Sequence, residues 1–92
     1  MNTTHQTRTA TYHWMSDPGH AWLAVDMEEL DLLGITKQIS PYSYQRNDIA
    51  YLEEDCDAPL FIEAMRAQGV DMQFRTHHTD FDSVIRSYRR FP

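Results

Sequence analysis

The 92-residue chain lacks most residues that mark a small secreted, membrane or nucleotide-binding protein. Its one cysteine, Cys56, excludes an internal disulfide and a multi-cysteine zinc site. The three glycines are isolated at positions 19, 34 and 69, so no glycine-rich phosphate loop is present. No apolar run approaches the roughly 18 residues of a membrane span, and the polar N-terminus has no apolar signal core. We therefore expect a cytoplasmic protein.

Basic residues are scarce between positions 17 and 63, where eleven Asp and Glu residues accompany only Lys37 and Arg46 and the net charge is −9. Such a segment repels phosphates, so direct binding to nucleic acid is not expected. Residues 64–92 carry five arginines and a net charge of +2. These opposite charges leave two kinds of partner open, a basic protein or a second copy of the chain in a homodimer.

The apolar fraction of 41% and the aromatic fraction of 12% are sufficient for a folded domain with one modest core. Residues 1–8 are polar and are expected to form a flexible N-terminal tail. Residues 9–92 contain no linker or repeat, so we expect them to form a single domain.

The first half of this domain predicts a β-hairpin followed by a short helix. Residues 9–15 are rich in β-branched and aromatic types, "SDPG" is a turn signal, and "HAWLAV" alternates. The helix is expected over residues 27–33. Asp26 precedes Glu29 by three residues, the spacing of a capping box in which each side chain bonds a free backbone N–H.

The next segment predicts a second hairpin and a second helix. Alternating aromatic and apolar residues flank the "RND" turn in "YSYQRNDIAY". The helix that follows is expected to end near residue 68, with Asp55 or Asp57 as its N-cap and Pro59 in its first turn.

The C-terminal part contains the clearest strand signal, over residues 70–77, where Val, Met and Phe alternate with polar residues. Residues 82–90 fit either a short helix or a strand, and we favour the helix. The expected fold class is α+β, with an antiparallel sheet of four to five strands and two or three short helices packed on one face.

The stretch "YLEEDCDAPL" concentrates four carboxylates, and two interpretations fit it. In one, they cap and stabilise the positive end of the second helix. In the other, they belong to an anionic surface for a partner's Lys and Arg side chains, anchored by tyrosines. The residues of that surface are Asp26, Glu28, Glu29, Asp31, Glu53, Glu54, Asp55, Asp57, Tyr42 and Tyr44. The pattern lacks the alternating Asp positions and Gly of a calcium loop.

The histidines and the thiol give weaker signals. His77, His78 and Asp80 together are a donor set for zinc or another transition metal, but their spacing matches no known metal motif, and a polar turn is the favoured interpretation. His13 and His20 flank the first turn, where they would face each other. Neighbouring carboxylates raise the pKa of a thiol, so Cys56 is expected to be a small buried residue and not a nucleophile. We expect neither a cofactor nor a catalytic site.

Four blocks, "PGHAWLAV", "ISPYSYQ", "AYLEEDCDAPLFIEA" and "HTDFDSVIRSY", taken together resemble a family of short uncharacterised proteins of proteobacteria, their plasmids and their phages. The resemblance spans residues 18–88. Two features depart from it: Asn-Asp where relatives tend to have a turn glycine, and an acidic "DFDS". Small acidic proteins of such mobile elements resemble, as a class, anti-CRISPR and anti-restriction inhibitors of host defence.

The sequence therefore predicts an acidic, noncatalytic binding protein of mobile-element type. Its expected partner is a basic, nucleic-acid-binding host protein or complex. Two alternatives remain, an oligomeric accessory factor that self-associates through its acidic and basic ends, and a metal-binding enzyme that uses the histidines and Asp80.

Overall fold

The computed structural model describes residues 8–92, and the expected tail lies outside this range except for Arg8, the first residue of a strand. Six strands form one sheet within the described residues, in the order β5-β1-β2-β4-β3-β6. The elements are β1 (Arg8–Ser16), β2 (Ala21–Asp26), α1 (Met27–Leu33), η1 (Thr36–Gln38), β3 (Tyr44–Arg46), β4 (Ile49–Glu53), α2 (Ala58–Ala67), β5 (Val70–His78), η2 (Val84–Ser87) and β6 (Arg89–Arg90), where η marks a single-turn 3-10 helix.

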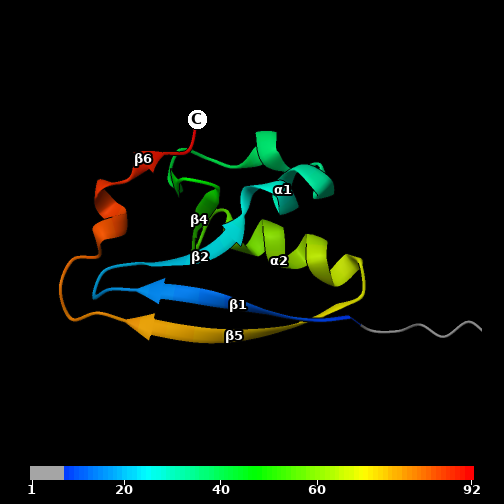
Figure 1. The fold of residues 1–92 in the computed structure, drawn as a ribbon, viewed down its shortest axis with the longest axis horizontal. Coiled ribbons are helices and arrows are strands. Elements are labelled where there is room, and N and C mark those ends of the chain that lie inside the picture. Colours follow the sequence, from blue (N-terminus) through cyan, green and yellow to red (C-terminus); the bar gives the residue numbers. More distant parts are fainter. Residues whose placement is uncertain (1–7) are drawn as a thin grey trace, which may run out of the picture.

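The α+β class, both hairpins, both α-helices and the strand over residues 70–77 are confirmed. The strand count and the purely antiparallel sheet were wrong. β4 runs in the same direction as β1, and the crossover through α2 returns β5 in that direction too, so β5 lies parallel to β1 (Figure 1). Residues 82–90 were expected to form a short helix or, as the alternative, a strand. They form a single 3-10 turn followed by a two-residue strand.

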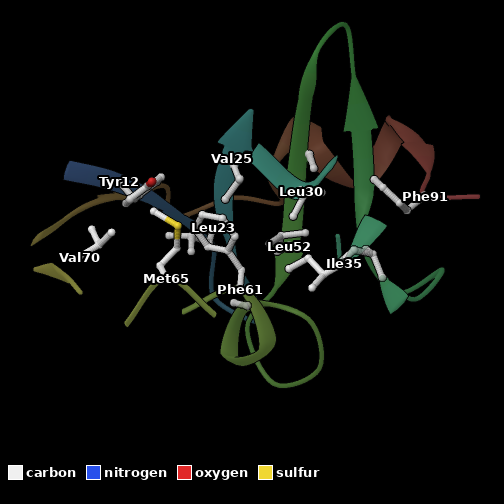
Figure 2. Packing of buried hydrophobic residues seen from close by; sticks show 13 residues of the cluster. Tyr12, Leu23, Val25, Leu30, Ile35, Leu52, Phe61, Met65, Val70 and Phe91 are labelled. Carbon is white, nitrogen blue, oxygen red and sulfur yellow. The ribbon is translucent and has the colours of Figure 1, made fainter. Parts of the chain in front are cut away.

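The two helices cover one face of the sheet and enclose the core. Strand alternation places Leu23 and Val25 on this face and Trp22 on the opposite one. Figure 2 shows Phe61 and Met65 of α2 near Leu23, in the same cluster of buried side chains. Burial of these apolar groups is the main source of stability in so small a domain.

The chain after β5 crosses to the far edge of the sheet. Figure 1 shows this segment, in orange and red, leaving β5 beside the β1–β2 turn and ending at β6. β6 pairs with β3, and Ile85 and Phe91 are buried along the way. The C-terminal segment therefore ties the two edges of the sheet together, because the edge strands β5 and β6 follow one another in the chain.

The predicted turns have physical causes in the backbone. Gly34 ends α1 with φ +72°, the left-handed conformation that glycine adopts most easily, and its N–H bonds the Asp31 carbonyl. Asn47 has φ +56° in the two-residue loop between β3 and β4, where a hairpin favours positive φ.

Candidate functional site

The carboxylates around α1 form one exposed depression, which we call the acidic hollow. It has a volume of about 520 Å³ and is lined by Asp26, Met27, Glu28, Asp31 and Asp48. Asp26 ends β2, and Asp48 comes from the β3–β4 turn. The other three lining residues belong to α1. The backbone places Asp48 here because the Met27 N–H donates to its carbonyl at 2.9 Å.

All four carboxylates of the acidic hollow are exposed, and none lies within 4 Å of an Arg or Lys nitrogen in residues 8–92. The hollow therefore carries four negative charges that the described part of the chain does not pair. Asp48 was missed at the sequence level. The predicted turn already contained it, and pairing of β2 with β4 would have placed it opposite the start of α1.

The expected capping box at α1 was wrong. Asp26 occupies the N-cap position, but its side chain makes no capping hydrogen bond. Glu29 turns toward the sheet, where its Oε1 accepts a hydrogen bond of 2.6 Å from the Tyr12 hydroxyl. Burial, followed by this contact with Glu29, raises the pKa of Tyr12. Glu29 therefore has an internal role. Asp31 stays exposed but also accepts a hydrogen bond, from the Thr36 hydroxyl.

The second predicted acidic segment divides into internal and exposed carboxylates. Glu53 is buried, and its Oε1 accepts hydrogen bonds of 2.9 Å from the N–H groups of Asp55 and Cys56. Asp57 is buried and accepts hydrogen bonds from Ser40 and Ser43. Two of the four carboxylates of this second acidic segment therefore hold the fold together.

The expected capping of α2 by a side chain was also wrong. Asp57 is at the N-cap position, but its carboxylate makes no capping bond to α2 because both oxygens are directed at the serines. Glu54 and Asp55 are exposed to solvent. They are the carboxylates of this segment that remain accessible to a partner.

The two acidic segments lie at opposite ends of the β2–β4 ladder. Asp26 pairs with Ile49 at one end, and Glu53 pairs with Trp22 at the other. The four residue steps between them correspond to about 13 Å along the strand. The expected single anionic surface is therefore two separate surfaces in this fold.

The second surface is a depression of about 360 Å³ that we call the aromatic groove. Trp22 is buried at its base, and its ring meets the Tyr44 ring edge to face at 6.1 Å. Tyr42 is 64% exposed at its rim. The residues that line it are His20, Trp22, Tyr42, Tyr44, Glu53, Asp55, Cys56, Arg86 and Arg90.

Arginines cover the aromatic rings of this groove. The guanidinium carbon of Arg86 lies 5.5 Å from the Trp22 ring centre, and that of Arg90 lies 5.2 Å from the Tyr44 ring centre. Such stacking uses the attraction between a cation and the negative face of a ring. The groove therefore presents both signs of charge around an aromatic base, whereas the acidic hollow presents one.

Arg86 is held in place by Asp17, a residue with no predicted role. The Asp17 carboxylate is buried and accepts from Nε and Nη2 of Arg86 at 2.7 and 3.0 Å. The N–H groups of Gly19, His20 and Ser83 also donate to it. The Arg86 guanidinium, with these N–H donors, holds the pKa of Asp17 well below its usual range. No local motif predicts this pair, because 69 positions separate its members.

Cys56 is exposed at the edge of the aromatic groove, so the expectation of burial was wrong. The Glu53 carboxylate is the main cause that raises the pKa of the thiol. At neutral pH the thiol is therefore protonated and is a poor nucleophile.

The predicted metal donors His77, His78 and Asp80 do not converge. His77 and His78 belong to β5, not to a turn. His77 approaches His13 from β1, whereas His78 contacts the Ser16 hydroxyl and lies 3.4 Å from Asp80. Within residues 8–92, no group of three or more His, Cys, Asp or Glu side chains is arranged to hold a metal ion. His20 does not meet His13, because it lies beside Trp22 and Glu53.

Comparisons with known proteins gave no match to a family model, a curated protein or a solved structure. Among the described residues, no helix combines the length and hydrophobicity that crossing a membrane requires. The two surfaces are therefore the features from which a function can be inferred.

Proposed function

We propose that this chain is a noncatalytic binding protein of mobile-element type that inhibits a host nucleic-acid-binding defence complex, such as a CRISPR or restriction system. The observation that carries the proposal is the acidic hollow, in which four exposed carboxylates share one depression without an internal cation partner in the described residues. In this proposal the hollow receives basic side chains that otherwise contact nucleic acid.

The arrangement suits a basic protein surface better than a single ion. Three of the carboxylates come from the start of α1 and the end of β2, and the fourth comes from a different turn, so they are spread around a depression. They do not form a cluster that could hold one metal ion. Spread carboxylates match a surface of several Arg and Lys residues and accelerate encounter with it.

The aromatic groove supplies a second contact for the same partner. Exposed Tyr42 lines it together with Asp55, whose carboxylate is accessible to solvent. Tyrosine buries a large area with little loss of side-chain freedom, which is why it often dominates binding energy. The family resemblance provides the mobile-element context and therefore the choice of a defence complex as the target.

The test compares three double charge reversals in a phage-infection assay. Cells that carry a defined CRISPR or restriction system express each variant, and plating efficiency of a targeted phage is measured. Glu28→Lys with Asp31→Lys alters the acidic hollow, and Glu54→Lys with Asp55→Lys alters the rim of the groove. Glu63→Lys with Asp71→Lys is the matched control, because it makes the same charge change at exposed residues outside both surfaces.

The expected result is that wild type and the control raise plating efficiency to a similar extent. With the variant in the acidic hollow, the increase in plating efficiency should be at least tenfold smaller than with wild type. With the groove variant, the reduction should be smaller. Circular dichroism establishes that each variant is folded. Equal protection by wild type and the hollow variant, or no protection by wild type against either kind of system, would contradict the proposal.

Self-association through unlike charges is the second candidate, and one observation favours it. Arg89 is exposed on β6, whereas the acidic hollow lies at the start of α1, so two copies could join unlike surfaces. Sedimentation at low and high salt distinguishes the two functions. A dimer of this kind dissociates as salt screens the charges, whereas a monomer at both salt concentrations excludes it.

A further inference from the structure

Two histidine rings on neighbouring strands converge on the face of the sheet that the α-helices leave uncovered. His13 of β1 and His77 of β5 place Nδ1 and Nε2, respectively, 2.8 Å apart. The ring centres lie 5.0 Å apart with an interplanar angle of 32°. Both residues are exposed, so solvent and ions can reach the two nitrogens. At this separation one ring donates an N–H to a ring nitrogen of the other, and the tautomers decide which ring is the donor.

The separation is close to that of two nitrogens bound to one metal ion. Imidazole nitrogens lie about 2.0–2.1 Å from a bound zinc ion, so two of them are about 2.9 Å apart at a right angle and about 3.3 Å apart at the tetrahedral angle. Ion binding therefore changes the separation of the two nitrogens by only a few tenths of an ångström, while each ring turns so that its nitrogen points at the ion and no longer at the other ring. Both residues lie on strands, and β1 pairs with β5 along its whole length. The sheet thus fixes the backbone positions from which both side chains project on the same face.

The neighbours of the pair decide its preference among ions. Arg75 pairs with His13 and Met15 pairs with His77, so the side chains of all four residues lie on one face of the sheet. The positive charge of exposed Arg75 opposes any cation. Within residues 8–92 no carboxylate completes a group of three donors, which disfavours hard ions such as Mg²⁺ and Ca²⁺. Imidazole donors favour late transition metals, and affinity rises toward Cu²⁺ in that series.

We propose that His13 and His77 form a two-point site for a divalent late transition-metal ion and that Cu²⁺ binds more tightly than Ni²⁺ or Zn²⁺. Water completes the coordination, and the rings bind through Nδ1 of His13 and Nε2 of His77. Each ring then carries its proton on its other nitrogen. Acid weakens binding because protonated imidazole has no free electron pair for the ion. This site does not depend on the function proposed above.

The experiment titrates Cu²⁺, Ni²⁺ and Zn²⁺ separately into the untagged, EDTA-treated full chain and measures affinity by isothermal calorimetry at neutral pH. His13→Gln and His77→Gln remove one donor each. His20→Gln and His78→Gln are matched controls, because they remove exposed histidines outside the pair. A His5→Gln variant tests whether copper binds instead at the N-terminal segment, which lies outside the described residues.

We expect wild type to bind one Cu²⁺ per chain at the pair, and either His13→Gln or His77→Gln to weaken this binding at least tenfold. The His20, His78 and His5 variants should retain the tight binding of wild type. Electron paramagnetic resonance of the Cu²⁺ complex should show nitrogen couplings from two imidazoles, which a structural effect of either substitution would not explain.

Arg75→Gln provides a second test that does not remove a donor. Loss of the neighbouring positive charge should increase Cu²⁺ affinity severalfold without changing stoichiometry. The proposal is overturned if His13→Gln and His77→Gln bind Cu²⁺ as tightly as wild type. It is also overturned if His5→Gln alone abolishes binding, because copper would then bind only at the N-terminal segment.

Discussion

Two buried carboxylates stabilise this molecule in different ways. Asp17 is 4% exposed and Asp57 is 3% exposed, so both lose nearly all contact with water. Asp17 is paired with a guanidinium and accepts three backbone N–H groups. Asp57 has no cationic partner among the described residues and accepts hydrogen bonds from two serines. A buried carboxylate therefore needs hydrogen-bond donors in both places, but a counter-charge in only one.

The difference follows from what each carboxylate connects. Asp17 joins the β1–β2 turn to η2, two segments that approach only because the C-terminal segment crosses the sheet. The pair places Arg86 over Trp22 and so shapes the aromatic groove. Asp57 joins the start of α2 to the loop after η1, which is close in sequence. A distant connection uses a charged pair here, and a local one uses neutral hydroxyls.

The largest effect is expected from Asp17→Asn. The substitution keeps the size of the side chain but leaves Arg86 without its counter-charge and turns an amide N–H₂ group toward it. Breaking a buried ion pair costs about 3–5 kcal/mol, and the partial exposure of Arg86 places the expected loss near the lower end, about 3 kcal/mol. Urea denaturation measures the free energy of unfolding.

The control for this prediction is Asp17→Asn combined with Arg86→Gln. If the loss arises from the uncompensated guanidinium, the double variant should be more stable than Asp17→Asn alone, as a double-mutant cycle would reveal. A loss below about 1 kcal/mol for Asp17→Asn would mean that the backbone N–H donors, not Arg86, account for the stabilising role of Asp17.

Acid should reduce the difference between wild type and Asp17→Asn. The pKa of Asp17 is lowered in the folded state, so its stabilising contribution is present above the unfolded pKa of about 3.9 and is lost as pH falls toward the folded value. Between pH 7 and pH 3 the stability gap should narrow by about 1.3 kcal/mol. Urea denaturation of wild type and Asp17→Asn at pH 7 and at pH 3 measures this difference in the free energy of unfolding, and Asp57→Asn is measured for comparison. A gap that stays constant contradicts the assigned cause.

Both hairpins, both α-helices and β5 were predictable because each depends on neighbouring residues. The alternation of residues 70–77, the turn signals of both hairpins and Gly34 after α1 were sufficient to identify them. Sheet order was not predictable in this way. The parallel pairing of β5 with β1 depends on the direction in which α2 crosses the sheet, and no residue within β5 encodes that direction.

The candidate sites differ in the same respect. Clustering of acids near residues 26–31 predicted most of the acidic hollow, because those residues share one turn of structure. Pairing of His13 with His77 and of Asp17 with Arg86 joins residues more than 60 positions apart. The local sequence favoured capping roles for Asp26 and Asp57. Asp26 is instead exposed to solvent, and the Asp57 carboxylate accepts hydrogen bonds from serines outside α2.

The smallest effect is expected from Asp57→Asn. The amide oxygen can still accept the Ser40 N–H, and the N–H₂ group can donate to the hydroxyls of Ser40 and Ser43 once these rotate. No cation loses its partner, so the cost is limited to weaker hydrogen bonds, about 0.5–1 kcal/mol. Urea denaturation of both variants under the same conditions compares their losses in the free energy of unfolding. If both variants lose equal stability, the negative charge of Asp57 itself stabilises the fold, and its position at the positive N-terminus of α2 would be the cause.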